Sequence, residues 1–250
     1  MNCININESI VDEFIDNLDN ELSIRKKDLS SLKEIIDSTN NLNNKFTLMR
    51  STYPSLYAHY EGFLKSSFWY LIDSIKNTNT SLIDLNPNFI ILSLVPSLEA
   101  HLVKQVSKSN AMVSVFDKVF NGNINLFDAM LKDKYVINHD TLQSTFDLLG
   151  INYNNINCSG FDNKNFPLTE LGILYERRNG LAHGEVSPNT FKVFSLSKSS
   201  DINKNQVDTA YTFWMDGYDN VISSLELLKN IFLDYLIEEK YLGNLSPIAF

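Results

Sequence analysis

Residues 207–235 read VDTAYTFWMDGYDNVISSLELLKNIFLDY and carry the strongest periodic pattern of the chain. Large apolar side chains recur there at alternating spacings of four and three residues, which places them on one face of a helix. These residues are Val207, Tyr211, Trp214, Tyr218, Val221, Leu225, Leu228, Phe232 and Tyr235. The pattern predicts one long amphipathic helix that ends before Gly243.

A second stripe of this kind lies upstream, between Met49 and Leu71. It consists of Met49, Tyr53, Leu56, Tyr60, Phe63 and Leu71, with Ser67 at one position of the repeat. Pro54 has no N–H to donate, so we expect it in the first turn of this helix, with Ser51 or Thr52 as the cap. If the helix begins earlier, Pro54 is expected to kink it.

Shorter patterns predict further helices. Apolar spacing predicts one helix over residues 10–22 and another over residues 29–36. Residues 88–106 also read as helical, and residues 111–120 form a short apolar segment. A last stripe, over residues 168–181, predicts a helix that runs into the sequence RRNGLAHG. Long helices without repeats or regular strands indicate an all-α bundle of long antiparallel helices.

The middle of the chain interrupts this bundle. Residues 121–166 are rich in Asn and Gly and are expected to form an insertion, with a short helix near residues 141–149. Gly184 is placed to end the helix that precedes it. TFKVFSLS (190–197) alternates in polarity and predicts a short strand or an extended connector.

Composition limits the class of protein. The chain has 250 residues, of which 44% are hydrophobic, enough for one domain over residues 1–250 with its bundle core in about 45–75 and 167–238. Its 21 basic and 30 acidic residues give a net charge of -9, which disfavours a protein that coats duplex DNA through phosphate contacts. Any nucleic-acid contact must therefore be local.

The ends and cysteines point to the cytoplasm. Cys3 and Cys158 have neither the spacing of a metal site nor that of a disulfide framework. The N-terminus lacks the basic and apolar regions of a signal peptide. The longest uncharged run, about residues 85–98, is too short to cross a bilayer. We expect a soluble cytoplasmic protein without a membrane partner.

Residues 176–185 read ERRNGLAHGE and contain two of the four arginines and one of the four histidines. Arg178 and His183 are separated by four residues, and Asn179 lies one helical turn before His183. An imidazole titrates near neutral pH and can take a proton from a ribose 2′-hydroxyl. A guanidinium can bind phosphate oxygens and stabilise the charge that develops on them. The combination suits cleavage of a phosphodiester without a metal or another cofactor.

The R-N-x3-H-G arrangement resembles the signature of HEPN domains, many of which are metal-independent endoribonucleases. The stretch MRSTYPSLYAHYEGFLKSSFWYL (49–71) also resembles the AHxEGF-type helix of a bacterial HEPN branch found in toxin and phage-defence loci. The resemblance covers about residues 45–75 and 167–238. It implies a homodimer in which the Arg and His of two protomers face each other.

The resemblance also implies roles for single residues. His183 would be the general base and Arg178 would stabilise the pentacovalent intermediate. Asn179 would position the phosphate or the imidazole, and Arg177 would hold a flanking phosphate. In the alternative, structural interpretation, Arg178 pairs with a nearby carboxylate such as Glu176, and His183 caps a helix C-terminus.

His59 and Glu61 lie in the AHxEGF-like helix, two residues apart and therefore on different helix faces. That spacing is poor for a shared metal, so no metal site is expected. Glu61 could orient Arg178 or His183 from a neighbouring helix. Alternatively, Glu61 could pair with an arginine, or His59 with a tyrosine, in a buried contact that stabilises the bundle. Gly62 is expected to allow a neighbouring helix to approach closely.

The sequence thus predicts a HEPN-type endoribonuclease that cleaves RNA by attack of the 2′-hydroxyl. By analogy with the family, it would be a toxin or a phage-defence effector with an antitoxin or another regulatory protein as partner. The alternative is a non-catalytic HEPN-like module that binds a protein partner or a nucleotide. Signatures of nucleotide-cofactor enzymes, P-loop ATPases and serine hydrolases are absent from the sequence.

Overall fold

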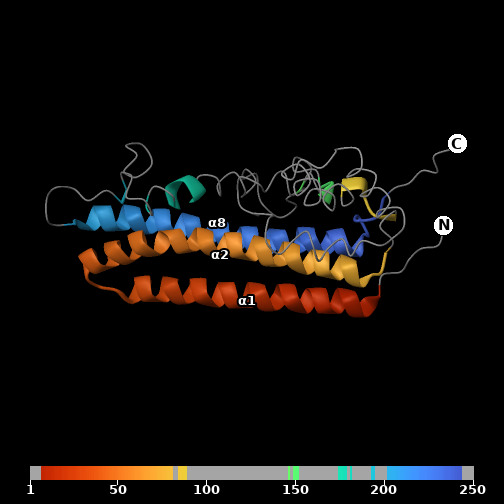
Figure 1. Cartoon of the computed structure of the whole chain (residues 1–250). Coiled ribbons are helices and arrows are strands. Elements are labelled where there is room, and N and C mark those ends of the chain that lie inside the picture. The colour runs from red at the N-terminus through yellow and green to blue at the C-terminus, as the bar shows by residue number, and fades with distance from the viewer. Residues whose placement is uncertain are drawn as a thin grey trace, which may run out of the picture. The chain divides into compact units, whose positions relative to one another are not determined.

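The computed structural model describes residues 7–80, 84–88, 146, 149–151, 174–178, 181, 193–194 and 202–243. Within these residues lie the long helices α1 (Glu8–Ser38), α2 (Leu42–Asn77) and α8 (Lys204–Ile237), which Figure 1 labels. An isolated antiparallel bridge joins Leu85 to Leu242. The predicted all-α class is confirmed. No helix among the described residues has both the length and the apolar character needed to cross a bilayer.

Helix α8 confirms the long helix predicted from residues 207–235. Asn203 and Gln206 cap its start: each side-chain oxygen accepts a hydrogen bond from the backbone N–H of the other residue, at 3.0 Å. Most of the predicted stripe is buried, whereas Tyr211 and Tyr218 lie at the edge of the buried face. The fully covered side chains on this helix include Trp214, Leu225 and Phe232, each 0% exposed.

Helix α1 is continuous, so the prediction of separate helices over residues 10–22 and 29–36 was wrong. The segment between them contains no Gly or Pro that could end a helix. The carboxylate of Glu21 also accepts hydrogen bonds from Arg25 four residues later, an arrangement that supports helix across this segment. Leu22 and Leu29 are both buried, one on each side of the expected break.

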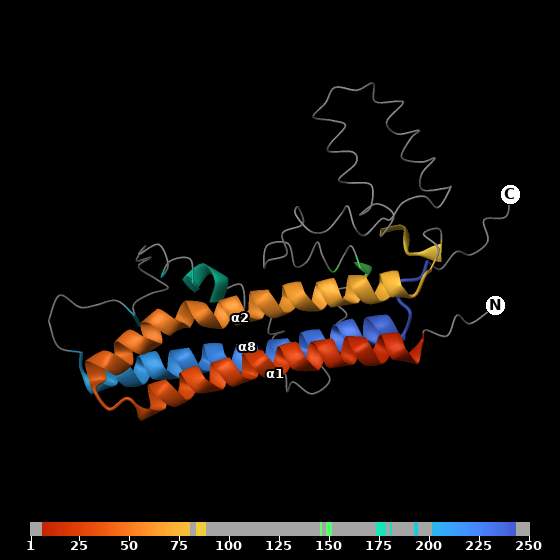
Figure 2. The ribbon, with the colours of Figure 1, turned by 60° about the horizontal axis from the view of Figure 1, so that its bottom comes forward.

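Helix α2 begins at Leu42, so Pro54 lies inside it, and the prediction of a first-turn proline was wrong. The start is instead capped by Asn41, whose side-chain oxygen accepts from the backbone N–H of Asn44 at 3.0 Å. The expected caps, Ser51 and Thr52, both donate to the carbonyl oxygen of Leu48. In Figure 2, α2 changes direction in its first third, as a proline inside a helix produces.

The chain divides into two compact units. Each of the helices α1, α2 and α8 lies partly in one unit and partly in the other. The first, here called the site unit, comprises Leu18–Ser66 and Cys158–Asn230. The second, here called the terminal unit, comprises Met1–Asn17, Ser67–Asn157 and Ile231–Phe250.

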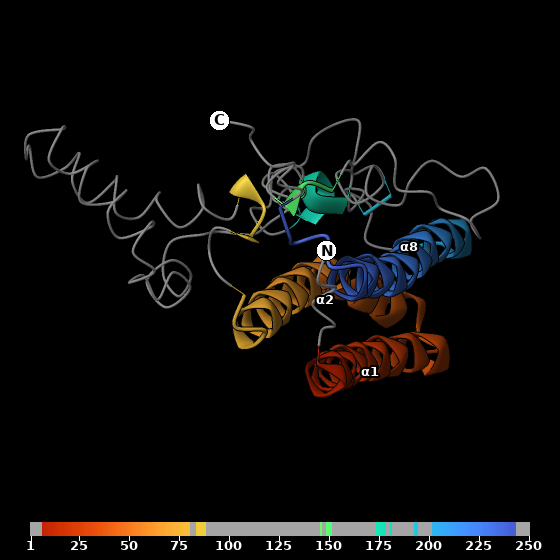
Figure 3. The same ribbon diagram turned by 90° about the vertical axis from the view of Figure 1, so that its right-hand side faces the viewer.

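In the site unit, the three long helices lie side by side, with α1 antiparallel to α8 (Figure 3). Lys229 pairs with Asp19, and the Tyr211 hydroxyl donates to Asp37 at 2.6 Å, so early residues of α1 meet late residues of α8. Helix α2 packs against α8 as well, and the indole N–H of Trp214 donates to Oγ1 of Thr52 at 3.2 Å.

In the terminal unit, the end of the last helix contacts the segment that follows α2. The backbone N–H of Asn86 donates to the carbonyl oxygen of Tyr241, and that of Gly243 to Asp84, both at 2.8 Å. The rings of Phe146 and Phe232 meet edge to face, with their centroids 6.4 Å apart. Both rings are fully buried.

Several predicted elements fall wholly or partly outside the described residues, among them the helices over 88–106 and 111–120 and most of the insertion over 121–166. Residues 146 and 149, in the short helix predicted near 141–149, are helical and buried. Residues 174–178 and 181 are helical, as predicted from the stripe over 168–181. Val193 and Phe194 lie in a turn, so a strand over 190–197 was wrong at these positions.

Candidate functional site

The two adjacent arginines lie on a short helical segment, residues 174–178, in the site unit. In Figures 1 to 3 this segment lies against α2 and α8, on the side away from α1. Leu174 anchors it and is only 3% exposed. The segment therefore presents Arg177 and Arg178 to side chains of two long helices.

The guanidinium of Arg177 lies over an aromatic ring. Its central carbon is 4.1 Å from the ring centroid of Phe213 on α8. Its Nη1 donates a hydrogen bond of 3.4 Å to the hydroxyl of Tyr53 on α2. Its Nε is buried and has no hydrogen-bond partner among the described residues. Arg177 thus bridges α2 and α8.

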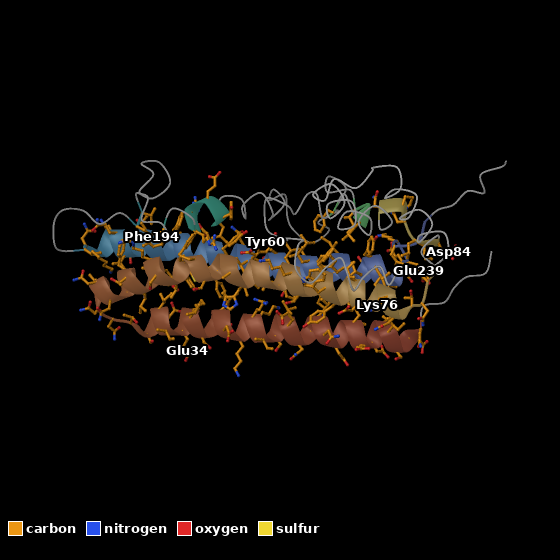
Figure 4. All side chains as sticks on the ribbon, viewed as in Figure 1. Glu34, Tyr60, Lys76, Asp84, Phe194 and Glu239 are labelled. Carbon is orange, nitrogen blue, oxygen red and sulfur yellow. The ribbon has the colours of Figure 1, made fainter. Side chains whose placement is uncertain are left out.

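Four aromatic residues, here called the aromatic clamp, surround this contact: Phe46, Tyr53, Phe194 and Phe213. Tyr53 stacks on Phe213 at 5.1 Å, and Phe194 lies 5.5 Å from each of them. Phe46 meets Phe194 edge to face at 6.0 Å. Tyr53 and Phe194 are almost completely buried, at 1% and 2% exposed. Figure 4 shows Phe194 beside the N-terminal part of α8.

Helices α2 and α8 approach each other closely beside the aromatic clamp. A Cβ on Gly217 would lie 3.1 Å from Cδ1 of Leu56 and 3.2 Å from Cε2 of Tyr53. Only glycine therefore fits between these side chains without a shift of its neighbours.

Arg178 faces a second set of rings. Its guanidinium carbon is 5.5 Å from the ring centroid of Tyr57, which is fully buried on α2. Tyr57 in turn contacts Tyr175 at 5.3 Å and Tyr60 at 5.9 Å. The guanidinium of Arg178 therefore lies over an aromatic surface of α2.

Asn179 and His183 lie outside the described residues, as does Gly184. The structure thus describes the two arginines of the predicted site but not its proposed base. In the sequence, His183 follows helical residue 181 by two positions.

His59 belongs to a different surface of α2, the one that faces α1. Desolvation by burial, followed by the positive charge of Arg25, lowers its pKa, while Asp28 opposes the shift. Its Nδ1 is buried without a hydrogen-bond partner among the described residues. A Cβ on Gly62 would lie 2.5 Å from Nη1 of Arg25, so the space beside Gly62 takes the end of a side chain from α1.

Glu61 forms an ion pair within its own helix. Its Oε1 accepts a hydrogen bond from Nζ of Lys65 at 2.7 Å. Orientation of Arg178 or His183 by Glu61 stays a prediction.

The apolar stripes did not predict the aromatic clamp. Phe213 lies one residue before Trp214 and outside the predicted stripe of α8, and Phe194 comes from a turn. The one signal available was the density of aromatic residues, 16 Phe and 11 Tyr in the chain. Such a count does not tell which rings meet.

The fold and this site define an all-α module whose Arg-x4-His segment begins at the edge of an aromatic cluster. The family model described as HEPN_MAE_28990-like HEPN matches residues 14–241, and the chain belongs to this family. A search among curated proteins finds no match, and a search among solved structures also finds none.

Proposed function

We propose that the protein is a HEPN-type endoribonuclease that cleaves RNA without a metal. Membership of the family supports this proposal, because its matched region includes the whole RRNGLAHG segment. The observation that carries it is the placement of Arg178 on the ring of Tyr57 at 5.5 Å. A guanidinium held on a buried ring loses little conformational entropy when it binds a phosphate.

The proposed reaction is transesterification within the RNA. His183 takes the proton of a 2′-hydroxyl, and the 2′-oxygen attacks the adjacent phosphorus. Arg178 stabilises the charge on the pentacovalent intermediate, and Asn179 positions the phosphate. The 5′-oxygen leaves and takes a proton from water, and the imidazolium of His183 gives its proton up to water. The products carry a 2′,3′-cyclic phosphate and a 5′-hydroxyl.

A non-catalytic module that binds a protein or a nucleotide is the second candidate. The net charge of -9 favours this candidate over a nuclease, because an acidic protein repels the phosphate chain of RNA.

Substitution of the two reactive residues tests the proposal. Arg178→Ala and His183→Ala are expected to abolish cleavage of total RNA in EDTA, while helicity measured by circular dichroism is retained. Arg50→Ala and His139→Ala are the matched controls and are expected to cleave like the wild type. Cleavage by both Arg178→Ala and His183→Ala would contradict the proposal.

A nuclease of this kind would harm its host, so we also propose a role as a toxin or a phage-defence effector held by an antitoxin or another regulatory protein. Expression of the wild type is then expected to arrest growth, and His183→Ala is expected to relieve the arrest. Equal growth with both proteins in the absence of any partner would contradict this role.

A further inference from the structure

We propose that Arg177 is a positioning residue, which fixes the helical segment 174–178 on α2 and α8 and thereby places Arg178 for the reaction. The inference rests on the proposed function for the reaction itself. It assigns Arg177 a role different from the phosphate contact that the resemblance implies.

The guanidinium of Arg177 already has partners on its face and on its edge. Its face lies 4.1 Å from the centroid of Phe213, and its Nη1 donates to Tyr53. Its Nε is covered by protein. A phosphate could therefore not take the bidentate pair of hydrogen bonds that uses Nε, and a pair from Nη1 and Nη2 would have to share Nη1 with Tyr53.

Within the described part of the chain, Arg177 has no carboxylate partner. A partly buried cation without an anion is costly unless other groups compensate for its lost hydration. The ring of Phe213 and the hydroxyl of Tyr53 supply that compensation. This contact therefore favours one placement of the segment.

The partners of Arg177 are themselves packed closely against other rings. Tyr53 stacks on Phe213, and Phe194 packs against both rings. At Gly217, α8 packs so closely on Tyr53 that a Cβ there would lie 3.2 Å from Cε2 of this ring. An arginine attached to such a rigid surface transmits its position to the next residue, Arg178, through a single peptide unit.

The test combines hydrogen exchange with kinetics on four variants. Arg177→Ala, Arg177→Lys, Phe213→Leu and Tyr53→Phe are compared with the wild type, and Arg50→Ala serves as a control outside the clamp. Exchange is measured on the peptide covering residues 174–181 in the absence of RNA, together with Tm. Cleavage of a single-stranded RNA gives kcat, KM and the dependence of KM on salt.

We expect Arg177→Ala and Phe213→Leu to raise exchange in this peptide on the order of tenfold and to lower kcat by a similar factor. KM and its salt dependence should stay at wild-type values. Tyr53→Phe should show the same effects in weaker form. Arg177→Lys keeps the charge but loses the planar contact, so it should not restore kcat.

A phosphate contact gives a different result. Arg177→Ala would then raise KM and reduce its salt dependence by about one phosphate's share, roughly 0.7 in the logarithmic slope. Arg177→Lys would restore KM, and Phe213→Leu would cleave normally. Unchanged exchange in Arg177→Ala would overturn the inference even if the wild type proved inactive on RNA. Inactivity of the wild type would count against the proposed function alone.

A fall in Tm with unchanged kcat for the folded fraction would also overturn it. In that case Arg177 would contribute to stability without positioning Arg178.

Discussion

The guanidinium of Arg25 on α1 occupies the space beside Gly62 on α2, where a Cβ would lie 2.5 Å from Nη1. The same guanidinium donates to Glu21, whose Oε1 also accepts from the hydroxyl of Ser66 at 3.1 Å. Arg25 and Glu21 side chains are each 17% exposed. The glycine of the AHxEGF-like stretch thus makes room on α2 for a largely buried ion pair of α1.

This relationship predicts a dependence of one substitution on the other. In an Arg25→Ala background, Gly62→Ala should stabilise the protein by about 0.5–1 kcal/mol, the usual advantage of alanine over glycine within a helix. In the wild type, the new methyl group must displace the guanidinium, so the gain should disappear or become a loss. Urea denaturation of the four proteins measures this coupling. Equal effects of Gly62→Ala in both backgrounds would contradict the contact.

His59 should make stability depend on pH. Burial and Arg25 lower its pKa, so the unfolded chain binds a proton at a higher pH than the folded protein does. Stability should therefore fall as the pH decreases through about 6.5, the ordinary value for histidine. His59→Gln should lose less stability than the wild type between pH 7.5 and 5.5. Parallel changes in the two proteins, followed by urea denaturation, would count against this role.

Asp37 should also make stability fall as the pH decreases, although it is an acid and His59 is a base. Hydrogen bonds from Lys33 and then from Tyr211 lower the pKa of its carboxyl, so its contribution is present above the unfolded value and is lost as the pH falls through the folded one. Tyr211→Phe keeps the ring and removes one donor. The cost should be about 0.5 kcal/mol or less at pH 7, because the pair is exposed.

The difference between Tyr211→Phe and the wild type should begin to shrink as the pH falls below 3.8, the ordinary pKa of this carboxyl, and should continue to shrink as the pH falls through the lowered pKa of the folded protein. Thermal unfolding at pH 7 and pH 3.5 measures this difference. A constant difference in Tm would show that the hydroxyl acts elsewhere.

The long helices could be predicted where their buried positions are apolar, and the errors arose where they are not. In α1, the heptad between Leu22 and Leu29 contains Arg25, and its packing becomes possible only through Gly62 on another helix. The apolar stripes therefore predicted two helices where the structure has one. The prediction for Pro54 failed for a different reason: buried rings of α2 such as Tyr53 stabilise a helix that continues through the proline.

The site was predictable only as a segment. The RRNGLAHG spacing identified Arg177 and Arg178, but the sequence alone could not show that Arg177 would meet Phe213 and Tyr53. These three residues come from distant parts of the chain and meet only after α2 and α8 have packed. Local patterns carry no information on such contacts.

The family resemblance predicts a homodimer with a site shared by two protomers. Analytical ultracentrifugation should then give a mass of twice 28.6 kDa for the wild type. Arg178→Ala should keep that mass, because it removes a reactive group and not a long helix. A monomer at micromolar concentration, active on RNA, would contradict the shared site.

The chemistry of the cut ends tests the central claim most directly. Total RNA is incubated in EDTA with wild type or His183→Ala, and the product ends are mapped by their reactivity toward ligases and phosphatases. We expect 2′,3′-cyclic phosphate and 5′-hydroxyl ends with the wild type, and intact RNA with His183→Ala. Products that carry 5′-phosphates, or the same cyclic ends with His183→Ala, would contradict it.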